Sequence, residues 1–146
     1  MRMESEPPAE PMPACNPSVI DIEGMTCRNR TFRTVLWTGK HLQLTVMCIP
    51  VGQEIGLECH PNTDQFLRIE EGYGMVKMGA QKESLTFCRR AGAGDAILVP
   101  AGCWHNLVNV GCGPLKLYSI YAPPQHPEGT VHCTKKDAEN DETHSH

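Results

Sequence analysis

The chain carries, in two separate segments, side chains of the kinds that bind metal ions. The segments are 52–72 and 94–109, and each holds its polar residues at fixed distances from glycines or a proline. Two histidines, one carboxylate and one amide are the candidate ligands: Glu58, His60, Gln65 and His105. Such a set suits Fe(II), Mn(II), Zn(II) or Ni(II). We expect a divalent transition metal, with iron, manganese or zinc favoured, in an open site that leaves about two positions for water or substrate.

These side chains meet only if strands present them to one interior. Glu58 and His60 are two residues apart, so on an extended strand they project to the same side. The turn at 61–63 reverses the chain, and Gln65 then faces back toward that pair. His105 arrives from a distant segment, after a turn before the next strand. The expected result is a single site inside a barrel.

Two alternatives stay open at this point. Gln65 is a neutral amide, so it either binds the ion directly or hydrogen-bonds a metal-bound water. The other alternative is a barrel without a metal, in which Glu58 and His60 form an internal pair and His105 is an ordinary core histidine. Burying an ionised Glu58 without a cation is costly, which favours the metal site.

The rest of the pattern predicts an all-β fold. Thirteen glycines and twelve prolines with few aromatic residues suit short strands and tight turns. Eight or so strands at this spacing favour a double-sheet barrel or jelly roll, which also protects the sheet edges. The expected strands are 31–38, 42–49, 66–70, 74–78, 84–88, 96–99, 105–110 and 115–121.

One domain with two extended arms accounts for the whole chain. Residues 1–17 are rich in proline and glutamate and should form a disordered or extended arm. Residues 18–124 form the barrel, and 125–146 should be a surface segment with a solvated polar tail. His126 and His132 lie in that last segment and are expected on the surface.

The sequence also predicts the positions of several other residues. Trp104 and Tyr73 should stand near the mouth of the barrel or pack on its outer surface. Asn109 should stabilise backbone. The side chains expected to line the barrel are Met47, Phe66, Leu67, Met75, Leu98 and Leu107.

The composition of the chain restricts the classes of partner that it is expected to bind. The formal net charge of −4 and the pI near 5.9 argue against nucleic acid, and no apolar stretch approaches the roughly 20 residues that span a bilayer. A small-molecule ligand is the expected partner. The first fifteen residues lack the apolar region of a secretory signal, so a cytoplasmic location is expected. Eight cysteines without a Cys-x-x-Cys pair are then expected to be reduced thiols.

The spacings resemble the two signature motifs of the cupin superfamily over roughly residues 40–125. The second segment, with Pro100, Gly102 and His105, matches at every anchor position. The first departs from the common pattern at Glu58, where histidine is usual, and at Gln65, where glutamate is usual. The resemblance implies a double-stranded β-helix. In its size and single barrel the chain looks like the small cupins grouped with mannose-6-phosphate-isomerase-like proteins, and a homodimer is plausible.

Because cupins have many activities, the function stays open between three hypotheses. The leading one is a metal-dependent enzyme, of the isomerase or dioxygenase type, acting on a small oxygen-rich molecule such as a sugar. No catalytic base is assigned. The alternatives are a non-catalytic small-molecule or metal-binding sensor module, and a purely structural dimerising barrel without metal.

Overall fold

The structure, a computed structural model, describes residues 16–145 and places side chains as far as Asp141. Each of the eight expected strands is present, within a few residues at its ends, and two short helices and a ninth strand are added. In chain order the elements are α1 (Ile22–Arg28), β1 (Arg33–Thr38), β2 (Gln43–Ile49), β3 (Asp64–Glu71), β4 (Tyr73–Gly79), β5 (Phe87–Gly92), β6 (Ala96–Val99), β7 (Trp104–Asn109), β8 (Leu115–Ala122), β9 (Val131–His132) and α2 (Lys135–Ser145).

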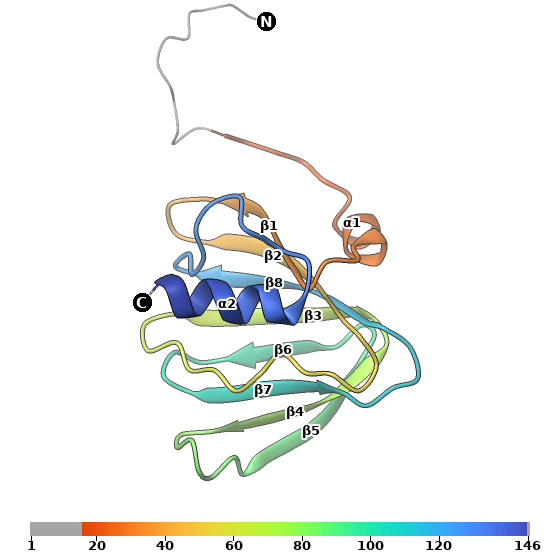
Figure 1. The fold of residues 1–146 in the computed structure, drawn as a ribbon, viewed down its shortest axis with the longest axis vertical. Coiled ribbons are helices and arrows are strands. Elements are labelled where there is room, and N and C mark those ends of the chain that lie inside the picture. Colours follow the sequence, from red (N-terminus) through yellow and green to blue (C-terminus); the bar gives the residue numbers. More distant parts are fainter. Residues whose placement is uncertain (1–15, 146) are drawn as a thin grey trace, which may run out of the picture.

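The strands form two antiparallel sheets, which confirms the predicted all-β double-stranded β-helix. The larger sheet has the order β6-β3-β8-β2-β1-β9, and the smaller has the order β5-β4-β7. Strands that are neighbours in a sheet are mostly distant in sequence, as in a jelly roll. In the view of Figure 1 the larger sheet lies above the smaller one, and β6 and β7 are edge strands of their sheets.

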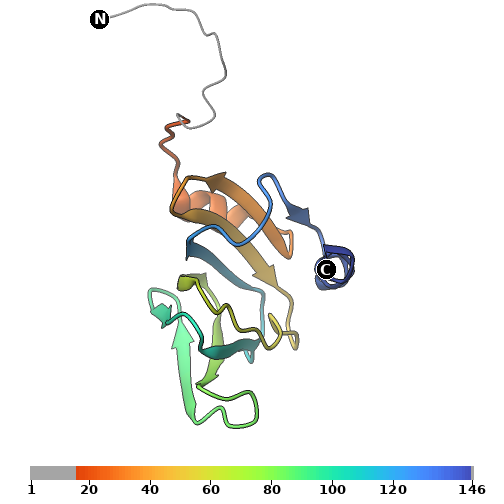
Figure 2. The same cartoon turned by 90° about the vertical axis from the view of Figure 1, so that its left-hand side faces the viewer.

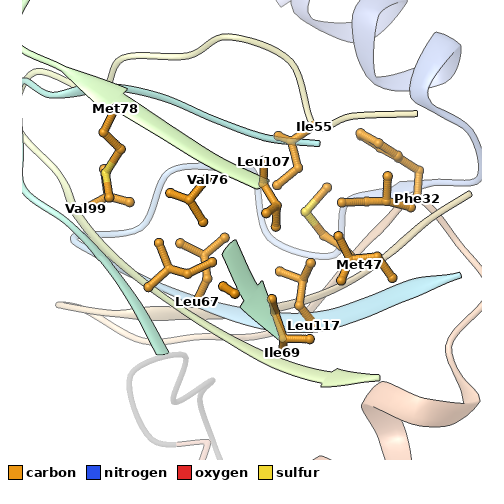
Figure 3. Packing of buried hydrophobic residues seen from close by; sticks show 14 of the residues in the cluster. Phe32, Met47, Ile55, Leu67, Ile69, Val76, Met78, Val99, Leu107 and Leu117 are labelled. Carbon is orange, nitrogen blue, oxygen red and sulfur yellow. The ribbon is translucent and has the colours of Figure 1, made fainter. Parts of the chain in front are cut away.

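The core lies between the sheets and follows the alternation of the strands. In β3 the inward residues are Gln65, Leu67 and Ile69, all buried, as the sequence predicted. They face apolar side chains of the smaller sheet, among them Val76 and Leu107 (Figure 3). Sheet-on-sheet packing of this kind buries one face of every strand.

The same alternation corrects part of the expected barrel lining. Met47, Leu67 and Leu107 are buried, but Leu98 is 66% exposed. Phe66 pairs with Leu98 across β3 and β6, on the face opposite to Leu67. Met75 likewise alternates with the buried Gly74 and Val76 of β4. The prediction was therefore wrong for Phe66, Met75 and Leu98, because each lies next to an inward residue on its strand, and two neighbours on a strand cannot both point inward.

A short helix that the sequence analysis did not predict begins the described chain. In α1, the Asp21 carboxylate accepts a hydrogen bond from Gly24 N at 3.1 Å, which satisfies a free amide of the first turn. The basic Arg28 in the last turn matches the negative end of the helix dipole. This helix packs against β8, β3 and β2. Figure 2 shows α1 and α2 on different sides of β1 and β2.

A second helix, α2, which the sequence did not predict, begins after residue 134. Thr134 and Asp137 cap α2 by reciprocal side-chain to backbone hydrogen bonds of 3.1 and 3.3 Å. Ala138 is buried in the core cluster, so a single small apolar residue anchors a helix that is otherwise polar. α2 therefore covers part of the barrel (Figure 1).

The Asn109 amide donates to Ile49 O and Gly113 O, which confirms its backbone role. The seven cysteines among the described residues are all free thiols, and Cys15 lies outside them with most of the expected N-terminal arm. Within residues 16–145, none of the helices is both long and apolar enough to cross a membrane.

Candidate metal centre

The two sequence segments meet through main-chain hydrogen bonds. Glu58 N donates to His105 O at 3.0 Å, and His105 N donates to Glu58 O at 2.9 Å, so the two residues lie directly opposite each other. Gly102 N also donates to His60 O at 2.8 Å. Residues paired in this way present their side chains to the same face. The 54–60 segment is joined to β7 by two isolated bridges, Glu54–Val108 and Glu58–His105, and by the hydrogen bond from Ile55 N to Leu107 O at 3.0 Å.

The predicted side chains Glu58, His60 and His105 come together. Their candidate ligand atoms all lie within 4.8 Å of one another. Glu58 Oε1 is 3.4 Å from His60 Nε2 and 3.9 Å from His105 Nε2, and the two imidazole rings are 5.4 Å apart. All three side chains are mostly buried, so the cluster is an interior site.

Hydrogen bonding determines which nitrogen of His105 carries the proton. His105 Nδ1 lies 3.0 Å from Cys103 O, and a carbonyl oxygen can only accept, so Nδ1 donates. Burial lowers the pKa of His105 below 6.5, which keeps the ring neutral. Nε2 is then a bare acceptor, buried and without a hydrogen-bond partner, and it faces a carboxylate. Histidines that bind metals are oriented in this manner by a backbone carbonyl.

The carboxylate stays ionised in this interior. Burial alone would raise the pKa of Glu58, but the neighbouring His60 imidazole and the Arg33 guanidinium outweigh it, and the pKa lies below its ordinary value. Arg33 Nη2 is 3.8 Å from Glu58 Oε2. The site therefore holds a negative oxygen 3.4 Å from His60 Nε2 and 3.9 Å from the unpartnered Nε2 of His105.

Gln65 enters the interior from β3, on the face that was predicted. Its side-chain nitrogen donates to Ser119 Oγ at 2.9 Å, and its oxygen is buried without a hydrogen-bond partner. An unpartnered buried amide oxygen is available to an ion or to a bound water. Its part in metal binding stays a prediction.

A buried arginine, which the sequence did not predict, lies beside the site. Arg33 is 1% exposed and opens β1, where it shares the inward face with Val35. Strand alternation was the signal, but an arginine is rarely assigned to an interior because its charge is costly to bury. β9 pairs with β1 so that His132 lies opposite Arg33.

The expected surface position of His132 was wrong. The residue is 5% exposed, with Nδ1 3.5 Å from Arg33 Nη1 and Nε2 2.8 Å from Asp141 Oδ2. A guanidinium can only donate and a carboxylate can only accept, so His132 accepts at Nδ1 and donates at Nε2. Asp141 belongs to α2, which links the C-terminal helix to the site.

His126 is also half-buried, against expectation, and borders a cavity next to the candidate metal ligands. Its Nε2 is buried and unpartnered, and burial lowers the pKa of its ring to about 3, so it is neutral at physiological pH. The cavity has a volume of about 360 Å³. It is lined by Leu57, Glu58, Cys59, His60, Trp104, Gln125, His126, Pro127, His132 and Asp141.

The segment that carries His126 is fixed by a fully buried glutamine of β2. Gln43 Oε1 accepts from the backbone amides of Gln125 and His126 at 3.0 and 2.9 Å. Gln43 Nε2 donates to His126 O at 2.7 Å and to Thr38 Oγ1 at 3.0 Å. Tyr121, whose ring lies edge-on to both His60 and His126, completes this wall.

Comparisons with known proteins agree with this architecture. Residues 45–121 match the family model described as a cupin domain. The crystal structure of BH2720 from Bacillus halodurans is similar with a TM-score of 0.85 and 59% sequence identity, over 86% of this chain and 95% of that one.

Relatives with curated sequences add no assigned activity. The uncharacterised protein YrkC of Bacillus subtilis is 62% identical over 84% of this chain, which spans 66% of that protein's length. The uncharacterised protein L612 of Acanthamoeba polyphaga mimivirus is 35% identical over 77% of this chain and 69% of its own length.

Proposed function

This chain belongs to the cupin family, and we propose that it binds one divalent transition metal ion through Glu58, His60 and His105. The observation that carries the proposal is the bare, buried Nε2 of His105, which faces a carboxylate at 3.9 Å without a hydrogen-bond partner. Two lone pairs that face each other in an interior repel unless a cation lies between them. The pKa of His105 lies below its ordinary value, so at neutral pH that cation is not a proton.

The donor set restricts the identity of the ion. Two imidazoles and one carboxylate suit iron, manganese or zinc, and nickel is also compatible. Gln65 serves as a fourth ligand through its unpartnered oxygen, or acts through a bound water.

We further propose that the protein is an enzyme of the isomerase or dioxygenase type. A bound divalent ion supplies Lewis-acid stabilisation of an enolate-like negative charge. The chain's own residues provide a cavity of about 360 Å³ whose wall offers imidazole, amide and carboxylate groups. Such a wall suits hydrogen bonds to a small oxygen-rich molecule, such as a sugar. His126 is the neutral imidazole placed to hydrogen-bond that molecule.

A non-catalytic small-molecule sensor module is the second candidate. One observation favours it: Asp141, the carboxylate besides Glu58 that lines the cavity, is already bonded to His132 at 2.8 Å. Glu58 itself loses basicity as a metal ligand, which leaves no evident carboxylate base for proton transfer among the described cavity residues.

Metal analysis tests the proposal directly. Protein purified without nickel affinity chromatography should contain about one transition metal ion per chain by mass spectrometry. His105→Ala should lose that ion, while His41→Ala, a change at an exposed histidine, should keep it. Full metal retention by His105→Ala would show that this residue is not a ligand.

Activity screens on the metal-loaded protein separate the two candidates. Oxygen uptake with diols and diketones indicates the dioxygenase type, and interconversion of sugars indicates the isomerase type. Tight ligand binding without turnover in either screen favours the sensor. A native zinc ion with no oxygen consumption would end the dioxygenase branch.

We also propose that the protein forms a homodimer and is located in the cytoplasm. Exposed or half-buried apolar residues on the outer face of the larger sheet, including Leu42, Leu98 and Ile120, support a self-associating surface. Light scattering of the purified protein measures whether the mass is that of one chain or two.

A further inference from the structure

We propose that the C-terminal helix controls the metal site through Asp141, His132 and Arg33, which we call the tether. This inference rests on the proposed metal binding. Asp141 and His132 are positioning residues that keep the Arg33 guanidinium from closing on Glu58. They thereby leave the Glu58 carboxylate free for the ion.

Arg33 has an unusual position relative to Glu58. Its side chain is 1% exposed, and it lies 3.5 Å from His132 Nδ1 and 3.8 Å from Glu58 Oε2, with Tyr121 as a further neighbour. Its Nε has no hydrogen-bond partner. A direct arginine–carboxylate hydrogen bond is about 2.7–2.9 Å long, and often bidentate. Arg33 and Glu58 are therefore close but not joined in the manner that their charges favour.

Asp141 and His132 restrain the Arg33 guanidinium. Asp141 accepts the Nε2 proton of His132 at 2.8 Å, which fixes the His132 tautomer with a free lone pair at Nδ1. That lone pair is the acceptor toward Arg33 Nη1. Without Asp141 the proton can move to Nδ1, and His132 then presents a donor to a group that can only donate.

Release of Arg33 would weaken metal binding at Glu58. A guanidinium bonded bidentately to Glu58 would occupy both carboxylate oxygens, including Oε1, the atom that faces His60 and His105. The released arginine would then compete with the metal for the same ligand. Residues that orient metal ligands from behind typically change metal affinity by about 10–100-fold when they are replaced.

The test uses two variants of the full chain. His132→Phe removes the acceptor for Arg33 and keeps the volume of a ring, and Asp141→Ala removes the carboxylate from a half-exposed helix position. Competition with a chromophoric chelator gives the affinity for Zn²⁺, and the visible spectrum of Co²⁺ reports whether the ligands are retained. Both variants should bind Zn²⁺ roughly tenfold more weakly while the Co²⁺ spectrum keeps its shape.

Lys135→Met is the matched control on the same helix. It breaks the ion pair between Lys135 and Glu54, 3.8 Å long, which also fastens α2 to the barrel but does not touch the tether. Its Zn²⁺ affinity should equal that of the wild type. If Lys135→Met weakens binding as much as Asp141→Ala, the effect comes from loosening the helix, and the tether is refuted.

A double variant tests whether the effect passes through Arg33. In an Arg33→Met background, adding Asp141→Ala should cause no further change in Zn²⁺ affinity. An equal loss in both backgrounds would overturn the proposal, and so would wild-type affinity in both tether variants. These outcomes leave the metal site itself intact, whereas a wild-type protein that binds no metal refutes the proposed function instead.

Discussion

Replacing Gln43 by leucine should detach the segment that carries His126 from the wall of the cavity. Gln43 is fully buried and makes four hydrogen bonds of 2.7–3.0 Å, three of them to the backbone of Gln125 and His126. Leucine has a similar volume but no polar atom. The change therefore removes the hydrogen bonds without opening a large cavity.

The expected loss of stability follows from those bonds. Each hydrogen bond contributes about 0.5–1.5 kcal/mol, and a buried group left unpaired costs about 1–3 kcal/mol. Gln125 is exposed, so its amide can regain a bond to water, and the leucine gains apolar burial. We therefore expect Gln43→Leu to lower the free energy of unfolding by about 2–4 kcal/mol.

Urea unfolding followed by circular dichroism measures this change, with Gln81→Leu, at an exposed position, as the control. The Zn²⁺ affinity should stay within about twofold of the wild type, because Gln43 contacts none of the three metal ligands. A loss below about 1 kcal/mol, or one equal to that of Gln81→Leu, would refute the argument that Gln43 holds this segment.

Two further predictions concern backbone and pH. Gly72 has φ 87°, and a Cβ there would lie 2.6 Å from Pro114 O, so Gly72→Ala should cost about 2 kcal/mol or more in urea unfolding. A Cβ at Gly113 would meet nothing within 4 Å, so Gly113→Ala should change stability by less than about 0.5 kcal/mol. Equal losses of stability in Gly72→Ala and Gly113→Ala would contradict the steric reason. Burial lowers the pKa of His126 from 6.5 to about 3, so the unfolded chain binds a proton that the folded chain refuses, and stability should fall as the pH drops from about 6.5 toward 3. His126→Gln should flatten that part of the stability profile, and an unchanged profile would mean that another group is responsible.

The strands could be predicted because strand alternation is a local pattern. The candidate ligand His105 is far from Glu58 and His60 in the sequence, and it was predicted from the match of its segment to the second cupin motif. Alternation within β3 placed Gln65 and Leu67 on one face correctly. The same alternation places Phe66 on the other face, against the expectation that it lines the barrel. The fixed separation of Glu58 and His60 was likewise enough to bring them to one side.

The rest of the site could not be predicted because it depends on contacts between distant parts of the chain. His132 lies in a proline-rich region that suggests surface, and its burial arises only when β9 pairs with β1. Asp141 lies in a highly charged stretch, and nothing local distinguishes it from its neighbours before α2 forms. The pairing that buries Arg33 is likewise visible only in three dimensions.

The main-chain bridge between Glu58 and His105 has a consequence for protein engineering. Because amide and carbonyl groups fix these two positions, the donor atoms can be exchanged without rebuilding the scaffold. Glu58→His would give an all-nitrogen face, and His105→Glu would give a second oxygen donor. In this barrel the preference of the site for harder or softer ions can therefore be varied one side chain at a time.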